Sequence, residues 1–466
     1  MTEAKKKFQL HTLVLIYLVV IMAAVLTWVV PGGEYERIVK NGRTLVDPAS
    51  FKYVESHPQG LDKVLIAPIK GFAKAAEIII FVLLIGGTFY ILEKTGALTN
   101  SIKYLAIKFS SHPHLQKFFI PVTMLIFSAA GSIFGMCEET MPFVLIFIPL
   151  AISLGYDSLV GTAIPFLGAA AGFAGSTLNP FTVGIAQSIA ELPLYSGLEY
   201  RIVVWVISTI SMIAFVMIYA ARIKKDPKKS PVYEIDLARS NRIEIHNHDE
   251  AILTRRHKII ITVFVGGIIF LVYGILSLGW FINEIAGFFL GIGIVTGYIG
   301  GLKSYDIAEG FKNGAKDMMG VALIIACAKA LLVVAQDGKI LDSMLYNFAG
   351  VISGLHPVIG SQAMFVVQGT INFFVHSGSG QAALTMPIMA PLADVTGISR
   401  QTAVLAFQFG EGWINPILPT SGVTMGVLGL AGIQWSTWAR WMLWAQIYFF
   451  ILALLLLIPP YFINYH

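Results

Sequence analysis

Residues 131–140 read GSIFGMCEET and residues 372–381 read NFFVHSGSGQ, and each is a polar, glycine-rich segment inside an apolar region. The apolar arms on either side of them are each about half to two-thirds as long as a membrane-spanning helix. Within a bilayer, non-helical backbone persists only where protein or a water-filled cavity satisfies its polar groups. The two segments therefore predict the tips of re-entrant hairpins, one over residues 118–154 and one over residues 358–395.

Two further segments interrupt long apolar stretches, GFAGSTLNPFT at 172–182 and GEGWINPILPTS at 410–421. In each of them a proline removes a backbone donor and disfavours helix at the residue before it. Asn179 and Asn415 precede these prolines and so lie at natural unwinding points.

These interruptions predict broken helices over residues 159–189 and 401–430. The N-termini of the half-helices would offer free N–H groups to a carboxylate, and the freed carbonyls would bind Na⁺. The alternative is that glycine, serine and threonine only allow helices to pack closely, which is their commoner role in membranes. Dense polar clusters at matched places in both halves favour the interpretation that these segments form a binding site.

The composition indicates that these segments lie in a membrane. Of the 466 residues, 56% are hydrophobic and 13% are charged, which is about half the charged share of a soluble protein. The chain is therefore predicted to be an all-α polytopic membrane protein in contact with the lipid bilayer. Other runs long enough to span the membrane lie at 10–30, 78–92 (extended by 64–76), 202–219, 259–280, 285–300, 318–335 and 441–458.

The sequence lacks the motifs that several other classes of function require. Cys137 and Cys327 lie inside apolar runs and predict neither a disulfide nor a metal site. There is no Walker A loop and no HExxH motif, and no base can be named beside Ser379, so neither an enzyme nor a cofactor is predicted. The basic segment after Tyr219 is interspersed with acidic residues, and nucleic acid is not expected as a partner.

Basic residues predict the orientation of the chain. The segment from Arg222 to Lys258 is rich in lysine and arginine, which places it in the cytoplasm by the positive-inside rule. Lys5 to Lys7 place the N-terminus on the same side. We therefore expect a first membrane repeat over residues 1–222, a solvated cytoplasmic linker over residues 223–257 and a second membrane repeat over residues 258–466.

The two halves share short matches at an offset of about 240 residues. The matched groups are Lys70-Gly71-Phe72 with Glu309-Gly310-Phe311, His112-Pro113 with His356-Pro357, Thr140-Met141-Pro142 with Thr385-Met386-Pro387, and Pro149-Leu150-Ala151 with Pro391-Leu392-Ala393. Counting the spans makes the two halves enter the membrane from opposite sides. Inverted-topology repeats of this kind are typical of secondary transporters, which bind their substrates where the repeats meet.

Three glutamates, Glu138, Glu139 and Glu411, lie in or beside the interruptions. Because burial of a charge in a membrane is costly, such groups are functional candidates. Glutamates suit a proton, Na⁺ or a cationic substrate, whereas a dicarboxylate would rather meet arginine or lysine, and near the tips there is mainly His376. Lys329, within a membrane span, could balance a glutamate, and its role is left open.

The segments 135–140, 172–182 and 410–416, with Pro419-Thr420-Ser421, resemble the YfcC family, which is related to the DcuC-type anaerobic C4-dicarboxylate carriers of the ion transporter superfamily. The resemblance covers almost the whole chain. It implies a multi-pass carrier of the bacterial inner membrane with a scaffold domain, an elevator-type transport domain and homodimers. Some relatives are regarded as arginine/ornithine or other amino-acid exchangers and others as C4-dicarboxylate carriers.

We therefore expect a secondary active transporter, by symport or antiport, for a small carboxylate-bearing metabolite, most simply an amino acid and within that class a basic one. A C4-dicarboxylate carrier is the alternative, and a channel or membrane sensor is the alternative from another class. The coupling ion would be Na⁺ or H⁺, with Na⁺ near Gly131, Asn179, Gly378 and Asn415. The candidate substrate-binding residues are Ser132, Glu138, Glu139, Ser176, Thr177, Asn179, His376, Ser377, Gly378, Ser379, Glu411, Asn415, Thr420 and Ser421.

Overall fold

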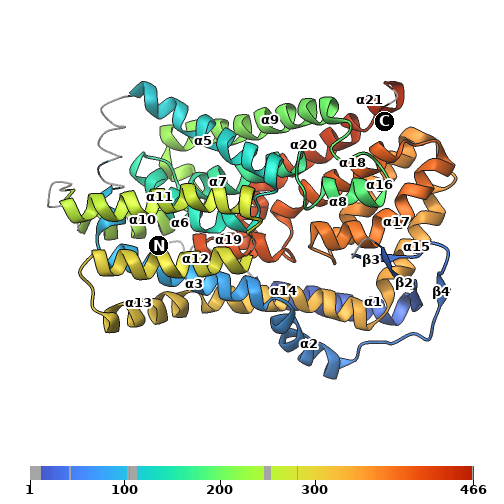
Figure 1. The fold of residues 1–466 in the computed structure, drawn as a ribbon, viewed down its shortest axis with the longest axis horizontal. Helices are drawn as coiled ribbons and strands as arrows, with labels where there is room; N and C mark the ends of the chain where they lie inside the picture. The colour runs from blue at the N-terminus through green and yellow to red at the C-terminus, as the bar shows by residue number, and fades with distance from the viewer. Residues whose placement is uncertain are drawn as a thin grey trace, which may run out of the picture.

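The computed structural model describes residues 12–40, 43–101, 104, 113–245, 253–280, 282–463 and 465, and these form an almost entirely helical protein (Figure 1). The start of the first predicted span at residue 10, the lysines Lys5 to Lys7 and His112 lie outside the described residues. Within the described ranges, six helical segments are long and apolar enough to cross a membrane: Ala76–Lys94, Leu198–Lys225, Ile282–Ile299, Met319–Asp337, Arg400–Ala431 and Trp435–Phe462. The chain is thus an almost entirely helical protein with several membrane spans.

One layer of the molecule is built on two crossed helix pairs that lie along the lower side of Figure 1. The first pair is α2 (Leu61–Lys74) followed by α3 (Ala76–Lys94), and the second is α13 (Ser304–Asp317) followed by α14 (Met319–Asp337). Each amphipathic helix packs on the apolar helix of the other pair, α2 on α14 and α13 on α3. Glycines allow the backbones to approach, since a Cβ at Gly314 would overlap the backbone of α3. Helices α1 (Thr12–Val29) and α12 (Ile282–Ile299) complete this layer beside α14 and α3.

The second layer holds the helices on either side of the four predicted interruptions. In the first half α5 (Pro113–Phe134) leads through a short tip and the 3₁₀ turn η1 (Glu138–Thr140) into α6 (Met141–Ser153), and α7 (Ser158–Ala174) is separated from α8 (Val183–Ile189). In the second half the corresponding elements are α16 (Pro357–Asn372), α17 (Gly378–Thr396), α18 (Arg400–Gly412), the 3₁₀ turn η3 (Asn415–Ile417) and α19 (Gly422–Ala431). The helices stop at the residues where the sequence predicts interruptions.

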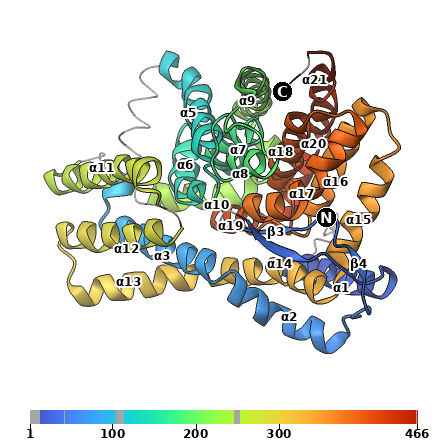
Figure 2. The same ribbon diagram turned by 45° about the vertical axis from the view of Figure 1, so that its right-hand side comes forward.

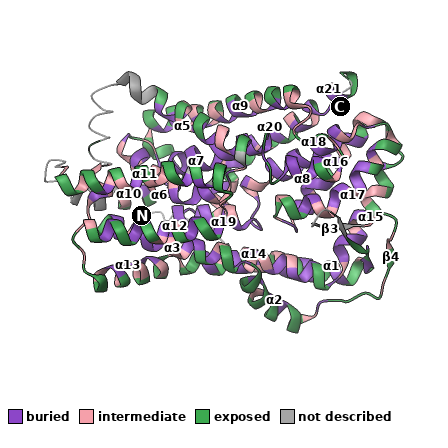
Figure 3. Ribbon diagram, viewed as in Figure 1, coloured by how far each residue is buried: buried purple, intermediate pink, exposed green. Residues whose placement is uncertain are grey.

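Two long helices, α9 (Leu198–Lys225) and α20 (Trp435–Leu456), border this second layer, and α11 (Arg255–Leu278) lies at one end of the molecule (Figures 1 and 2). The buried residues are concentrated between the helices, and the outer side of α9 is largely exposed (Figure 3). The exposed side chains there are apolar and include Ile210, which is 62% exposed, and Ile218, which is 73% exposed. Exposure of such an apolar face to water would cost free energy, and contact with lipid avoids this cost.

A small β-structure covers the end of the molecule opposite α11, and we call this end the strand end. Antiparallel pairs form between β1 (Gly33–Glu34) and β4 (Lys52–Tyr53) and between β2 (Arg37–Lys40) and β3 (Arg43–Val46). The strands are fixed to α15 (Ile340–Ile352), where Asp342 accepts the Tyr35 N–H at 2.9 Å and pairs with Arg37 at 3.0 Å. The final turn, α21 (Pro459–Phe462), lies at the same end (Figure 1).

Much of the described part of the segment that the sequence predicts as a solvated linker, residues 223–257, is helical. Helix α9 continues to Lys225, the turn η2 (Pro227–Lys229) follows, and α10 (Tyr233–Ile245) packs on α6. Within this segment Ser230 and Asp236 are buried. Charge density alone marks the segment as polar, but it does not reveal that its polar groups have partners on distant helices.

Those partners lie at the start of α7 and at the end of α19, on the side of the membrane that the sequence predicts to be cytoplasmic. Asp157, the N-cap of α7, accepts hydrogen bonds from Val160 N at 2.9 Å and from the Ser230 and Tyr219 hydroxyls. Asp236 accepts the Ser158 N–H at 2.7 Å, and Arg239 donates to the Ala431 carbonyl. We call this group of contacts the linker clamp. It joins the start of a broken helix from one half to the end of a broken helix from the other.

Replacing Asp157 by alanine is expected to destabilise the protein by about 2 kcal/mol or more, because it removes an N-cap and leaves two hydroxyls without their acceptor. A lower melting temperature of the purified protein in detergent would show this. Asp226→Ala is the matched control, since Asp226 makes a largely exposed ion pair with Lys229 at 3.4 Å and should contribute about 0.5 kcal/mol or less. Equal melting temperatures for the two variants would contradict a stabilising role for the clamp.

Candidate functional site

The predicted tip of the first hairpin, around the end of α5, packs directly against the segment between α7 and α8. The Ser132 and Thr177 hydroxyls lie 2.9 Å apart, and the Leu178 N–H donates to the Ser132 carbonyl at 3.2 Å. Gly135 has a φ of +75°, and a Cβ on it would lie 2.6 Å from Asn179 Oδ1. Glycine is therefore required at this turn both for its backbone angle and for space. Four candidate residues, Ser132, Ser176, Thr177 and Asn179, are brought together here.

The Asn179 side chain is largely used to hold the break itself. Its Oδ1 accepts the N–H groups of Phe181 at 2.9 Å and Thr182 at 3.3 Å, and its Nδ2 donates to Ser176 Oγ at 3.3 Å. An asparagine that bonds its own backbone two and three residues on replaces the missing helical hydrogen bonds. Asn179 therefore has a structural function in the described arrangement.

The second break is built around a contact that joins Asn415, Glu411 and Asn372. Asn415 Nδ2 donates to Glu411 Oε1 at 2.9 Å, and Asn372 Nδ2 donates to Asn415 Oδ1 and to the Glu411 carbonyl at 3.2 Å each. Asn372 ends α16, so the end of this helix is tied to the segment between α18 and α19. The sequence placed Asn372 in the hairpin tip but did not identify it as a site residue.

Several other hydroxyl-bearing candidates hold the starts of helices. Ser377 is the N-cap of α17 and accepts the Gly380 N–H at 3.2 Å, and Ser421 caps α19 in the same way through Thr424 N at 3.3 Å. Thr420 Oγ1 and His376 Nε2 lie 2.6 Å apart, which links the second tip to the second break. Ser379 is exposed on the first turn of α17.

The tip of the second hairpin also reaches the first half of the chain, at Gly378. A Cβ on Gly378 would lie 2.5 Å from Thr182 Cγ2 and 3.6 Å from Glu411 Oε1. Thr182 follows the first break, and Glu411 precedes the second. Both breaks and the second hairpin therefore meet at Gly378, and a side chain there would separate them.

Two of the three glutamates, Glu138 and Glu139, lie on η1, and Glu411 lies on α18. Glu139 is 8% exposed, and its carboxylate accepts the Cys137 N–H at 2.9 Å, so it closes the tip of the first hairpin. Cys137, the neighbour of Glu138, lines one cavity together with Asn415, which donates to Glu411. The segments that carry Glu138 and Glu411 are therefore close to each other.

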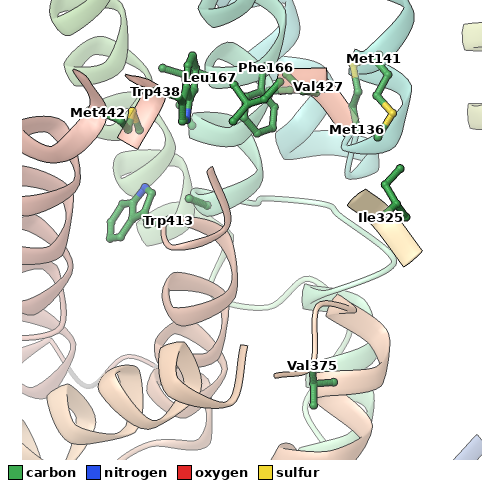
Figure 4. Close-up of a cluster of buried hydrophobic side chains, with 14 of the residues drawn as sticks. Met136, Met141, Phe166, Leu167, Ile325, Val375, Trp413, Val427, Trp438 and Met442 are labelled. Carbon is green, nitrogen blue, oxygen red and sulfur yellow. The ribbon is translucent and has the colours of Figure 1, made fainter. Parts of the chain in front are cut away.

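Backbone carbonyls freed at the second break are taken up by side chains of α20. Trp435 Nε1 donates to the Ile417 carbonyl at 2.9 Å, Trp438 Nε1 to the Pro416 carbonyl at 2.8 Å, and Gln446 Nε2 to the Trp413 carbonyl at 3.1 Å. Figure 4 shows Trp413, Trp438 and Met442 on one side of this region and Met136, Met141 and Ile325 on the other. These three carbonyls already have a donor, which accounts for irregular backbone at this depth.

A narrow cavity lies between the first tip and the second break. Its lining residues include Met136, Cys137, Phe173, Asn415 and Thr424, and its centre has room for roughly one water-sized group. A larger cavity, with about 1300 Å³ of open space, begins at the strand end beside Arg37 and Asp342 and reaches Ser377 and Gly380. The second tip is therefore approached from the strand end.

The part of the chain that the structure describes contains buried side-chain oxygens with no hydrogen-bond partner, and four of them surround these breaks. They are Asn372 Oδ1, Gln381 Oε1, Gln408 Oε1 and Glu411 Oε2. The Thr182 hydroxyl and the Trp413 Nε1–H donor, at the same breaks, also have no partner. The four oxygens are acceptors and outnumber these two groups, and a buried group without a partner costs about 1 to 3 kcal/mol. The region therefore has a surplus of acceptors, which a bound cation or an N–H donor would satisfy.

Gly131 lies inside α5, at its crossing with α7. A Cβ on Gly131 would overlap the Ala169 carbonyl, and one on Gly172 would overlap the Ser128 carbonyl. Close packing thus explains both glycines, as in the alternative considered for small residues in the sequence.

Comparisons with known proteins extend over almost the whole chain. Residues 10–461 match the family model DcuC, described as C4-dicarboxylate anaerobic carrier. The chain is 37% identical over 458 residues to a protein of Escherichia coli (strain K12) named "Putative basic amino acid antiporter YfcC", with 90% of each chain covered. It is 29% identical over 468 residues to a protein of Haemophilus influenzae, covering 90% of this chain and 91% of the other.

Among solved structures, the chain is similar to MtrF of Neisseria gonorrhoeae, which is described as a member of a class of antimetabolite efflux pumps. The TM-score is 0.41 and the sequence identity is 18%, and the similarity covers 97% of this chain and 95% of that one. The family match confirms the resemblance drawn from the residues around the interruptions. Because the family is one of transporters, the match also excludes the classes enzyme, channel and sensor for this protein. The chain belongs to the DcuC family and is a multi-pass secondary transporter of a bacterial membrane family.

Proposed function

We propose that this transporter exchanges basic amino acids, with arginine and ornithine as its reference substrates. The observation that carries the proposal is the surplus of buried acceptors between the two breaks, where Glu411 Oε2 and Asn372 Oδ1 have no partner among the described residues. A guanidinium or ammonium group supplies donors and positive charge together. The name of the Escherichia coli relative agrees with this substrate class.

In the proposed binding mode the cationic end of the substrate meets Glu138 and Glu411. The α-carboxylate meets the first turn of α17 at Ser377, Gly378 and Ser379, where free N–H groups and the helix dipole favour an anion. Glu139, Asn179 and Asn415 hold the tips and breaks in place, and Ser132, Ser176, Thr177, His376, Thr420 and Ser421 complete the polar lining. A coupling Na⁺, if the exchange uses one, would lie near Gly378 and Asn415.

The proposed architecture has two inverted repeats, each with a re-entrant hairpin and a broken helix. The layer that contains α5 to α8 and α16 to α19 forms the moving transport domain, and the layer that contains α1 to α3 and α12 to α14 forms the scaffold of a homodimer in an elevator mechanism. The matched order of helices in the two halves supports the repeats. The basic segment after Tyr219 supports a cytoplasmic N-terminus in the inner membrane.

The test is counterflow in proteoliposomes loaded with unlabelled arginine, ornithine, citrulline or succinate, each with and without Na⁺. We expect labelled external arginine to accumulate against internal arginine or ornithine, and not against citrulline, which has a neutral side chain. Dependence on Na⁺ would identify the coupling ion. Accumulation of labelled succinate without any response to arginine would contradict the proposal.

A C4-dicarboxylate carrier is the second candidate, because His376, Lys329 and the N-termini of α17 and α19 could together bind two carboxylates. The description of the family model agrees with this class. In that case Glu138 and Glu411 would bind protons or a cation, and the succinate arm of the same experiment would respond.

A further inference from the structure

Arg201, in the first turn of α9, is a buried charged side chain that lies outside the candidate site. It is 1% exposed, and its Nη2 donates to Gln401 Oε1 at 3.3 Å. Its Nε and Nη1 atoms are buried and have no hydrogen-bond partner, and no carboxylate among the described residues pairs with it. Because a guanidinium stays protonated in proteins, this positive charge is buried without a counter-charge, which is costly.

Arg400, at the start of α18, shows how a paired arginine is held in the same region. Its Nε and Nη2 donate to the two oxygens of Asp394 at 3.1 Å and 2.7 Å. Its Nη1 donates to the Ala190 carbonyl at 2.9 Å. Every nitrogen of this guanidinium therefore has an acceptor, whereas two of the three in Arg201 have none.

The side chains that surround the Arg201 contact are polar but neutral. Gln401 Oε1, which accepts from Arg201, also accepts from Gln187 Nε2 at 2.9 Å. Gln401 Nε2 donates to Ser196 Oγ at 2.6 Å. An amide oxygen that is shared between two donors thus occupies the place where an anionic oxygen would neutralise the guanidinium.

A cavity at the strand end reaches these groups. It has about 1140 Å³ of open space, and its wall includes residues of α21 together with Gln401 and Tyr465. The Gly197 carbonyl accepts the Tyr465 hydroxyl at 2.9 Å and the Arg201 N–H at 3.3 Å. Gln401 and Tyr465 are therefore in contact both with the cavity and with the first turn of α9.

We propose that Arg201 is the centre of an anion site, which takes one oxyanion, a carboxylate or phosphate group, from this cavity. A change of rotamer at Gln401 admits the ligand. The ligand oxygens replace Gln401 Oε1 at Nη2 and accept from a second guanidinium nitrogen, in the two-bond geometry that Arg400 makes with Asp394.

The anion site is separate from the proposed substrate site, because Gln401 and Glu411 lie near opposite ends of α18, about 15 Å apart along the helix. The same chemistry is offered by a soluble carboxylate or phosphate and by the headgroup of an acidic lipid. The experiment separates these two sources.

The test measures the melting temperature of the full-length protein in phosphatidylcholine nanodiscs, first in buffer without oxyanions and then with inorganic phosphate or acetate. Wild type is compared with Arg201→Met and with Arg222→Gln, the control at the opposite, exposed end of α9. We expect the anions to raise the melting temperature of wild type and control by about 3 °C more than that of Arg201→Met. The comparison between variants removes the general stabilising effect of phosphate on folded proteins.

A second series, in nanodiscs that contain phosphatidylglycerol and without added anion, tests the lipid source. A larger rise for wild type than for Arg201→Met in this series alone would assign the site to a lipid headgroup, and a larger rise with phosphate or acetate would assign it to a soluble anion. Equal responses of wild type and Arg201→Met in every series would overturn the inference. If Arg201→Met gives no folded protein, the same comparison is made with Arg201→Gln, which is neutral but keeps an N–H donor for Gln401.

Discussion

Replacement of Glu411 by glutamine is expected to reduce arginine exchange about a hundredfold or more while the protein still folds. Glu411 is 3% exposed, and only one of its carboxylate oxygens has a partner, Asn415 Nδ2 at 2.9 Å. A glutamine can keep that contact through its own oxygen. It cannot neutralise a bound cation, and losing one partner of a buried charge pair typically costs about 2 to 5 kcal/mol.

The measurement is initial exchange rate in proteoliposomes, with the melting temperature as the test of folding. Glu309→Gln is the matched control, because Glu309 pairs with Lys312 on α13 at 2.8 Å, away from both breaks. An unchanged exchange rate in Glu411→Gln would remove this carboxylate from the site. A fall in both rate and melting temperature would instead give Glu411 a structural role.

Replacement of Gly172 by alanine is expected to cost about 3 kcal/mol or more, because the added methyl group would overlap the Ser128 carbonyl of the neighbouring helix. The overlap is with backbone, which cannot move without separating α5 from α7. Since Ser132 and Thr177 hold the first tip to the first break through this same pair of elements, transport should fall together with stability.

The expected result is a loss of the monodisperse peak in size-exclusion chromatography or a lower melting temperature. Gly287→Ala is the matched control, because a Cβ on Gly287 in α12 meets nothing within 4 Å. Alanine there should be neutral or stabilise the helix by up to about 1 kcal/mol. A Gly172→Ala protein as stable as the wild type would show that the crossing can loosen.

The sequence predicted the positions of the helix interruptions closely. Proline after Asn179 and Asn415, and glycine at the tips, act on the backbone at the residue itself, so their effect can be predicted without knowledge of distant contacts. The structure ends α7 at Ala174 and α18 at Gly412, a few residues before the asparagines. The family was also predicted from these segments, and the comparisons confirm it.

The partners of the site residues could not be predicted in the same way. Asn372, Gln381 and Gln408 are single polar residues within apolar helices, and only the packing of distant helices shows that their oxygens are buried without a partner. The strands between Gly33 and Tyr53 were missed because they are short and depend on Asp342, more than 300 residues away in the sequence. The candidate roles of the glutamates and of Na⁺ stay predictions.

The linker clamp has a consequence for how the protein is made. The hydroxyls and N–H groups that bind Asp157 and Asp236 belong to residues synthesised within a short interval, so the start of α7 can be fixed early. The carbonyl that accepts from Arg239 belongs to Ala431, which is synthesised 192 residues later. During translation the contact between Arg239 and the last broken helix therefore forms last, and a nascent chain that stops before α19 would lack it.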